Sequence, residues 1–159
     1  MKQEGPYVSV AAICDQILLE KDDRISCIRF LDTLNVGVNM QRPQKPSVVR
    51  VQVNAFIAFK SGAFIGTKNC MLRLVSPSGK AGLLAANSPP SYPMTFNGGE
   101  HGHNLMVTLD IPASESGLYW FDVTLDDEVY ARIPLKINIT WQSSPTPIAP
   151  ESSENSSQV

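Results

Sequence analysis

The sequence predicts an all-β protein built as an antiparallel β-sandwich of about seven to nine strands. Three observations support this fold. Apolar and polar residues alternate along several segments, which is typical of strands with one buried face. Clusters of Gly, Pro, Ser and Asp separate these segments. Near the C-terminus, two long alternating segments flank Asp126-Asp127, which is typical of a β-hairpin.

The first apolar segment allows two interpretations. Its apolar residues change parity midway, which a kinked or bulged strand explains. A short helix over Ala11–Glu20 is the alternative, because Ile13 and Ile17 stand four residues apart. We favour the strand. The charged residues Lys21–Arg24 then predict a turn into the next strand.

The second alternating segment is interrupted by Asp32, at a position where an apolar residue is expected. The apolar residues on either side share one parity: Ile28, Phe30, Leu34, Val36 and Val38. Either a bulge shifts the phase at Asp32, or hydrogen bonds hold its carboxylate.

Three further alternating segments predict strands with one face in the core, at residues 49–60, 70–74 and 105–111. Pro and Gly mark the loops between them, at residues 42–46 and 61–62 and in the long stretch 77–93. We expect residues 77–93 to form a mobile spacer, because loops of this length are uncommon in compact domains.

The segment Ser116-Gly117-Leu118-Tyr119-Trp120-Phe121 begins the C-terminal hairpin. It resembles the start of the F strand in immunoglobulin-like domains, where a Ser-Gly-x-Tyr-x-Cys sequence turns the corner between two sheets and the tyrosine hydroxyl caps the backbone. Phe121 stands in place of the cysteine. The resemblance implies an immunoglobulin-like sandwich in which Phe121 points inward and Trp120 outward. Pro134 has the outward parity on the last strand, which predicts an edge or bulged position.

The chain up to Trp141 also resembles an uncharacterised bacterial family of β-sandwich domains. The resemblance rests on a Gly-Leu-Tyr-Trp-Phe-Asp-Val segment, here Gly117–Val123, that leads through an acidic turn to an Arg-Ile-Pro-Leu segment, here Arg132–Leu135. It implies a bacterial origin and a β-sandwich. That family has no established activity, so it offers no catalytic residue to transfer.

Length and composition exclude several classes of function. We expect residues 1–141 to form a single domain and the Ser-, Pro- and Glu-rich residues 142–159 to be a disordered tail. A net charge of −2 with 18% charged residues argues against a nucleic-acid partner. No apolar stretch is long enough to cross a membrane, and the three cysteines lie in apolar runs, so we expect a cytoplasmic protein with reduced thiols.

Catalytic motifs are missing from the sequence, and we expect neither an enzyme nor a bound cofactor. The alternative is a metal-binding module or metal-dependent hydrolase. His101 and His103 alternate along an extended chain and would point the same way, as two ligands of one metal do. Two histidines do not complete a zinc site, so further ligands would have to come from acidic loop tips. The simpler interpretation is a solvated polar turn.

Acidic residues occupy several predicted turns. If every segment reverses direction, these turns gather at one end of the sandwich and place the following residues on one rim: Asp22, Asp23, Glu100, His101, Asp126, Asp127 and Glu128. Such a rim would dock a basic partner or bind calcium. Acidic residues are also common in turns for purely conformational reasons.

Apolar side chains on outward parities mark a second candidate surface. They are Phe56, Ala58, Met106, Leu118 and Trp120. Aromatic residues and Met are enriched in interface cores, although the same chain would also be able to cover them. Our leading hypothesis from the sequence is a non-enzymatic β-sandwich that binds another protein or a second copy of itself.

Overall fold

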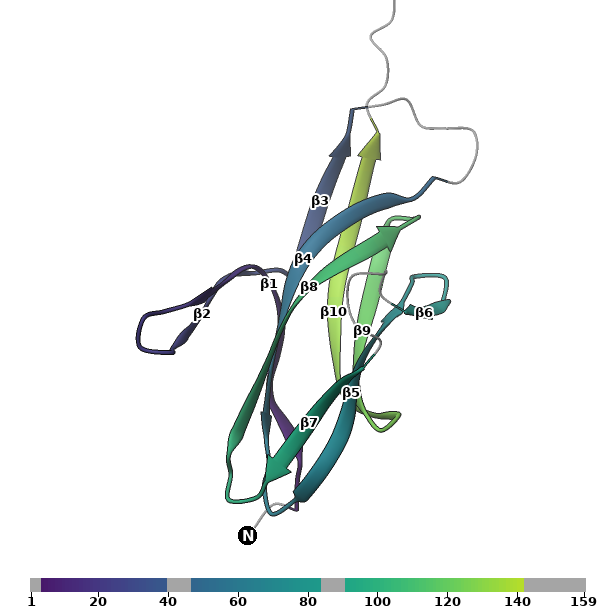
Figure 1. The fold of residues 1–159 in the computed structure, drawn as a ribbon. Helices are drawn as coiled ribbons and strands as arrows, with labels where there is room; N and C mark the ends of the chain where they lie inside the picture. The colour runs from purple at the N-terminus through teal and green to yellow at the C-terminus, as the bar shows by residue number, and fades with distance from the viewer. Residues whose placement is uncertain (1–3, 40–46, 84–90, 142–159) are drawn as a thin grey trace, which may run out of the picture.

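The computed structural model describes residues 4–39, 47–83 and 91–141. The described residues form ten strands that build two packed sheets (Figure 1). In chain order the strands are β1 Tyr7–Leu19, β2 Ile25–Phe30, β3 Thr33–Val38, β4 Val49–Lys60, β5 Ile65–Val75, β6 Ala81–Leu83, β7 Tyr92–Asn97, β8 Gly102–Ala113, β9 Gly117–Leu125 and β10 Glu128–Trp141.

The strand order confirms the predicted all-β sandwich. One sheet has the order β2-β1-β4-β8, and the other has the order β3-β10-β9-β5-β6, with β7 also paired to β5. Neighbouring strands are antiparallel, except that β3 runs parallel to β10. The described strands exceed the predicted seven to nine for two reasons. β6 lies in the stretch 77–93, which the sequence predicts as loop, and β7 begins at its end; residues 25–38 form two strands instead of one.

The core lies between the two sheets and follows the predicted alternation. Ala55, Ile57 and Phe59 of β4 are fully buried, and so are Phe121 and Val123 of β9. Because successive side chains of a strand point to opposite faces, every second residue of these strands enters the core. The large apolar side chains of both sheets thus form one buried cluster.

The tyrosine corner predicted from the immunoglobulin-like resemblance is present. Tyr119 is 1% exposed, and its hydroxyl donates a hydrogen bond of 2.8 Å to the backbone carbonyl of Glu115. Phe121 points into the core as expected, and Trp120 is half-buried on the opposite side of β9. The corner therefore fixes the direction in which β9 enters its sheet.

β1 is one long strand, so the alternative helix over Ala11–Glu20 is wrong. β4 pairs with β1 from Tyr7 to Cys14, and β2 pairs with its second half. The register with β4 is continuous from Val10 to Cys14, so no bulge lies at the change of parity between Ala12 and Ile13; the register shift of this strand lies earlier, between Val8 and Val10. The ladder with β4 in the first half and the ladder with β2 in the second half pair backbone groups that a helix would pair internally.

The two explanations offered for Asp32 are both wrong. The chain crosses from one sheet to the other at Leu31 and Asp32, between β2 and β3. Leu31 N donates to Ile13 O (2.9 Å) in one sheet, and Lys136 N donates to Asp32 O (2.9 Å) in the other. The Asp32 side chain is exposed, so its carboxylate interrupts no buried face.

No helix in the described part of the chain is long and apolar enough to span a membrane. The predicted tail at residues 142–159 and the predicted loop at 42–46 lie outside the described residues, as does the central part of the stretch 77–93.

Candidate functional site

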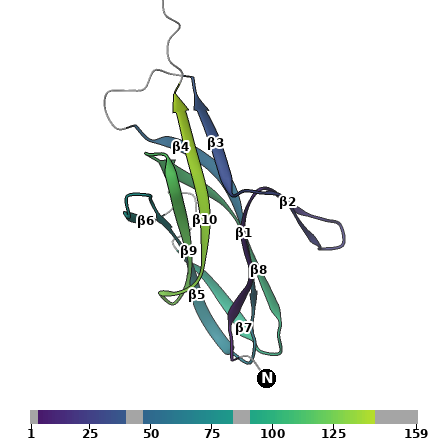
Figure 2. The same ribbon diagram turned by 180° about the vertical axis from the view of Figure 1, so that it is seen from behind.

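The second half of β1 and all of β2 form a hairpin that projects from the sandwich. The last pair between β1 and β4 is Cys14–Asn54, and beyond it residues 15–19 pair only with β2. Figures 1 and 2 show this hairpin pointing away from both sheets. Within the described residues β2 has no second strand neighbour. We call residues 16–19 and 25–28 of this hairpin the stem.

The stem has one apolar face and one mixed face. The cross-strand pairs Ile17–Cys27 and Leu19–Ile25 put four apolar side chains on the first face. On the second face Leu18 lies opposite Ser26, and Ile28 lies opposite Gln16. Leu19 is 63% exposed and Leu18 is 43% exposed. A sheet with one face in water normally carries polar side chains on that face, so the stem has an excess of exposed apolar surface.

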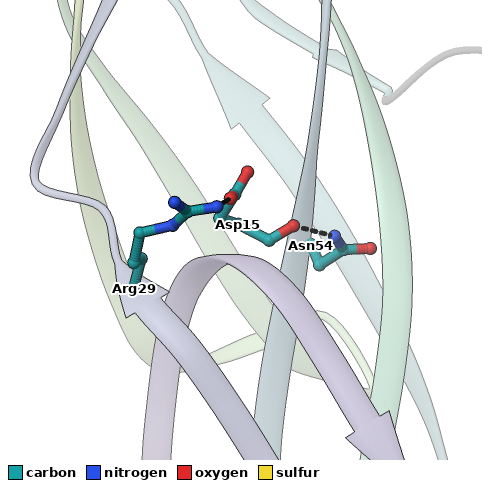
Figure 3. A network of polar contacts seen from close by, with 3 residues as sticks. All are labelled: Asp15, Arg29 and Asn54. Carbon is teal, nitrogen blue, oxygen red and sulfur yellow. Dashed lines mark hydrogen bonds and ion pairs between the residues drawn. The ribbon is translucent and has the colours of Figure 1, made fainter.

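A chain of polar contacts holds the base of the hairpin (Figure 3). The Arg29 guanidinium donates to the Asp15 carboxylate, and Asn54 Nδ2 donates to the backbone oxygen of Asp15 at 2.7 Å. Thr108 Oγ1 donates to Asn54 Oδ1 at 2.9 Å, so the chain links β2, β1, β4 and β8. Arg29 has a φ of 52°, the left-handed region that costs energy for residues other than Gly. Because the ion pair is exposed, we infer that these contacts position the hairpin more than they stabilise the fold.

The cysteines near the hairpin are free thiols. Cys14 is fully buried, and burial, together with the neighbouring Cys27 thiol, raises its pKa to about 11. Burial also raises the pKa of Cys70 to about 11. Both thiols stay protonated at neutral pH and are therefore poor nucleophiles.

An apolar cavity of about 330 Å³ opens beside the base of the hairpin. It lies where the edge of β1 faces the edge of β10, under the segment that crosses between the sheets. Its walls include Val10, Ala11, Phe30 and Ile133, and Asp32 is also among the lining residues. Phe30 is 63% exposed, so the cavity wall continues the exposed apolar surface of the stem.

The acidic turns do not gather on one rim. β1 runs antiparallel to β4, so the turn after β1, with Asp22 and Asp23, lies at the opposite end of that sheet from the turn after β4. Of the predicted acidic turns in the described part of the chain, the turn before β8 is the one that meets the turn after β4, where Glu100 N donates to Gly62 O at 3.4 Å. The predicted rim requires residues 25–38 to be one strand, but they form two strands in different sheets.

The carboxylates of the β9–β10 turn are already paired. Asp126 accepts hydrogen bonds from Asn69 N (2.8 Å) and Lys68 Nζ (3.0 Å), and these contacts lower the pKa of its carboxyl group. Arg73 donates to Asp127 at 2.6 Å. Both aspartates have positive φ, as type I′ hairpin turns require. This turn is therefore tied to β5.

The other acidic candidates are scattered. Asp22 pairs with Arg24 at 3.0 Å, and Glu100 accepts a hydrogen bond of 2.8 Å from the Tyr7 hydroxyl. Asp23 is an exposed turn residue, and Glu128 is exposed at the start of β10. A role for any of these residues in partner binding stays a prediction.

The two histidines have different surroundings. His101 is exposed, and its backbone oxygen accepts a hydrogen bond from Ser61 N at 3.0 Å. His103 is half-buried with its ring edge-on to Phe96, at a centroid distance of 5.2 Å. Its Nε2 is buried and has no hydrogen-bond partner within the described part of the chain. The described residues contain no group of three or more His, Cys, Asp or Glu side chains placed to hold a metal ion.

The apolar candidates lie on two different sheets. Phe56 and Met106 are cross-strand neighbours on β4 and β8, and Met106 is 43% exposed. Trp120 lies on the other sheet, opposite Pro134 of β10. These three side chains do not form one surface.

Sequence reasoning missed the stem, although its signal was visible as apolar residues of both parities at 17–19 and 25–28.

Comparison with solved structures finds matches of low sequence identity. An immunoglobulin-like protein from Pseudomonas aeruginosa is 12% identical, with a TM-score of 0.36, and the match covers 84% of this chain and 97% of that one. The alkylpurine DNA glycosylase AlkC from Pseudomonas fluorescens is 9% identical, with a TM-score of 0.40, and the match covers 67% of this chain and 27% of that one. Beta-glucosidase 3B from Thermotoga neapolitana is 12% identical, with a TM-score of 0.42, and the match covers 57% of this chain and 15% of that one.

This chain thus corresponds to only 27% and 15% of the length of the last two enzymes. No curated protein matches the sequence. Residues 9–138 match a family described as a Family of unknown function (DUF6941). The matched range includes the projecting hairpin, the cavity beside it and the tyrosine corner. The chain therefore belongs to this family of unknown function.

Proposed function

We propose that this chain is a protein-docking module and that the β1–β2 hairpin is its docking element. The observation that carries the proposal is the exposed apolar stem. Leu19 and Phe30 are each 63% exposed, on a hairpin that pairs with no other strand of the described chain beyond Cys14. Large apolar side chains grouped on a projecting element are typical of protein interaction sites.

The energetics favour a partner over solvent. An isolated two-stranded hairpin is marginally stable in water, because too little apolar surface is removed from solvent. Complete burial of a Leu or Phe side chain is worth roughly 1.5–3 kcal/mol, so covering the exposed parts contributes about 1–2 kcal/mol each for Leu19 and Phe30 and about 1 kcal/mol for Leu18. A partner that covers the stem therefore gains binding energy and also stabilises the hairpin.

The polar contacts at the base suit this role. Asp15 and Arg29 hold the hairpin at a defined angle to the four-stranded sheet through Asn54 and Thr108. An element whose orientation is fixed before binding loses less conformational entropy on docking. The hairpin is therefore presented to a partner in a set direction.

The test uses the full chain, expressed with an epitope tag in its native host. Leu19→Glu places a charge in the stem, and Ile65→Glu is the matched control because Ile65 is 75% exposed on β5, far from the stem. We expect the unmodified chain and Ile65→Glu to elute from size exclusion in a complex larger than the monomer. We expect Leu19→Glu to elute as a folded monomer. Co-elution of Leu19→Glu with the unmodified chain would overturn the proposal.

A further inference from the structure

The outer edge of β2 is open. β2 pairs with β1 on one side, and no strand of the described chain pairs with it on the other. Figures 1 and 2 show the hairpin pointing away from both sheets, which leaves room for a further strand beside it. β2 contains no proline, and its register with β1 is continuous from Ile25 to Ile28. Over these residues the edge therefore lacks two common protections against an added strand, a proline and a bulge.

The backbone groups of Ile25 and Cys27 point to this open edge. Glu20 N donates to Arg24 O at 2.8 Å, so the carbonyl of Arg24 faces β1. In an antiparallel pair, residues that exchange hydrogen bonds with the neighbouring strand alternate with residues whose N–H and C=O groups point away from it. Ile25 and Cys27 stand one and three residues after Arg24, so their backbone groups face away from β1.

A second copy of β2 fits this edge in one antiparallel register. When the two Ser26 residues face each other across a twofold axis, Ile25 of each copy lies opposite Cys27 of the other. The backbone groups that point to the two open edges then pair with one another. A shift by one hydrogen-bonded pair puts Arg29 or Asp23 into the ladder instead. Their φ values are 52° and 61°, outside the extended region, so neither residue suits a ladder.

The same register joins the two apolar faces. Residues that lie opposite each other in an antiparallel pair share one face of the sheet. Ile25 and Cys27 form the apolar face of the stem with Ile17 and Leu19, so the apolar faces of both copies lie on the same side. The result is one sheet of the order β1-β2-β2-β1. A sheet of more than two strands with an apolar face is stable where an isolated hairpin is marginal, so each copy stabilises the hairpin of the other.

The charges along the hairpin are complementary in this register. Asp23 in the turn of one copy lies beside Arg29 at the base of the other, and both side chains are exposed. Arg29 already donates to Asp15, but a guanidinium has several N–H donors and can bind a second carboxylate. Opposite charges at both ends of the contact favour this register, and they favour a second copy over a strand that lacks them.

We infer that β2 pairs with β2 of a second copy of this chain along its open edge, with Ile25 opposite Cys27 on either side of a twofold axis. The inference rests on the proposed docking function and names a second copy as the partner. The two hairpins run in opposite directions, so the two sandwiches lie at opposite ends of the joined sheet. Backbone hydrogen bonds give the contact its affinity, and the charges at its ends set the register.

The first experiment tests the register by disulfide cross-linking of the purified full chain. Ser26→Cys is introduced together with Cys27→Ser, and a mild oxidant is added. The two introduced thiols lie opposite each other at the twofold axis, within reach of a disulfide, so we expect a covalent dimer. Leu18→Cys with Cys27→Ser is the matched control. Leu18 lies opposite Ser26 on the same face, but both β2 strands separate it from its copy by about 14 Å, so it should give no dimer.

The second experiment tests the ladder by analytical ultracentrifugation over a range of concentrations. We expect the unmodified purified chain to form a dimer. Cys27→Pro removes an N–H that points away from β1, so it interrupts the ladder between copies and spares the ladder with β1. It should raise the Kd of the dimer by about tenfold or more, whereas Cys27→Ser keeps the N–H and should change this Kd by about twofold or less. Slow hydrogen exchange at Ser26 N checks that the hairpin is intact in both variants.

A purified chain that stays monomeric at every concentration would overturn the inference, as would a Ser26→Cys chain that cross-links no more than the Leu18→Cys chain. If Leu19→Glu still releases the complex in the native host, either result removes self-pairing alone, and the partner is a different protein. If Leu19→Glu co-elutes with the unmodified chain, the docking function fails as well.

Discussion

The β1–β2 and β9–β10 hairpins have similar local sequences and different surroundings. Each joins two apolar strands through an acidic turn. β9 and β10 have further neighbours in β5 and β3, and their inner faces are buried in the core. The stem of the β1–β2 hairpin has no such neighbours among the described residues and leaves Leu18 and Leu19 exposed. Burial by neighbouring strands, more than local pattern, therefore distinguishes a structural hairpin from a candidate docking element.

The largest expected effect is a difference between the two hairpins in how strongly a substitution lowers the free energy of unfolding. Phe121→Ala in β9 opens a cavity in the core and should lower the free energy of unfolding by about 3–5 kcal/mol. Leu19→Ala in β1 removes a mostly exposed side chain and should change the free energy of unfolding by about 0.5 kcal/mol or less. Urea denaturation of both variants measures the difference. Similar losses in the two variants would show that the stem is part of the core.

A smaller effect is expected at the tyrosine corner. Tyr119→Phe removes the buried hydroxyl and leaves the Glu115 carbonyl without its donor. This change should lower the free energy of unfolding by about 1–2 kcal/mol. Tyr7→Phe is the control, because it removes an exposed hydrogen bond to Glu100 and should have a much smaller effect. Equal denaturation midpoints for Tyr119→Phe and the unmodified chain would mean that the corner does not stabilise the fold.

The smallest predicted effect concerns acid stability of the β9–β10 turn. Contacts with Asn69 N and Lys68 hold the pKa of Asp126 below its ordinary value of 3.8. Its contribution to stability is therefore present above pH 3.8 and is lost as the pH falls through the lower pKa of the folded state. Asp126→Asn should remove this part of the acid dependence. Melting temperatures of the unmodified chain and of Asp126→Asn, measured across the acid range, check this prediction. If the two melting temperatures fall in parallel as the pH is lowered, the prediction is contradicted.

The sequence was sufficient to predict the elements whose two faces differ. In β4 and β8 the buried residues have one parity, so the period reported burial directly. The tyrosine corner was visible because it depends on a few adjacent residues, Ser116–Tyr119. The β1–β2 stem has apolar residues of both parities, and this pattern alone does not tell a docking element from a buried strand.

The arrangement of the strands was less accessible to sequence reasoning. Residues 25–38 read as one interrupted strand, but the chain changes sheet at Leu31 and Asp32 through two backbone hydrogen bonds that leave no pattern in the side chains. A prediction that misses this change of sheet puts the turn after β1 at the wrong end of the sandwich. It therefore groups acidic turns that lie apart in the structure. Which turns meet depends on strand direction, which alternation does not encode. The cavity between β1 and β10 follows from the same change of sheet.

The central claim is that the exposed stem contacts another protein. Its most direct test places a photo-reactive benzoylphenylalanine at position 19 of the full chain in the native host, with position 65 as the control, and measures the covalent adducts after illumination. We predict one defined adduct from position 19 and none in common with position 65. No adduct from position 19, or the same adducts from both positions, would contradict the claim.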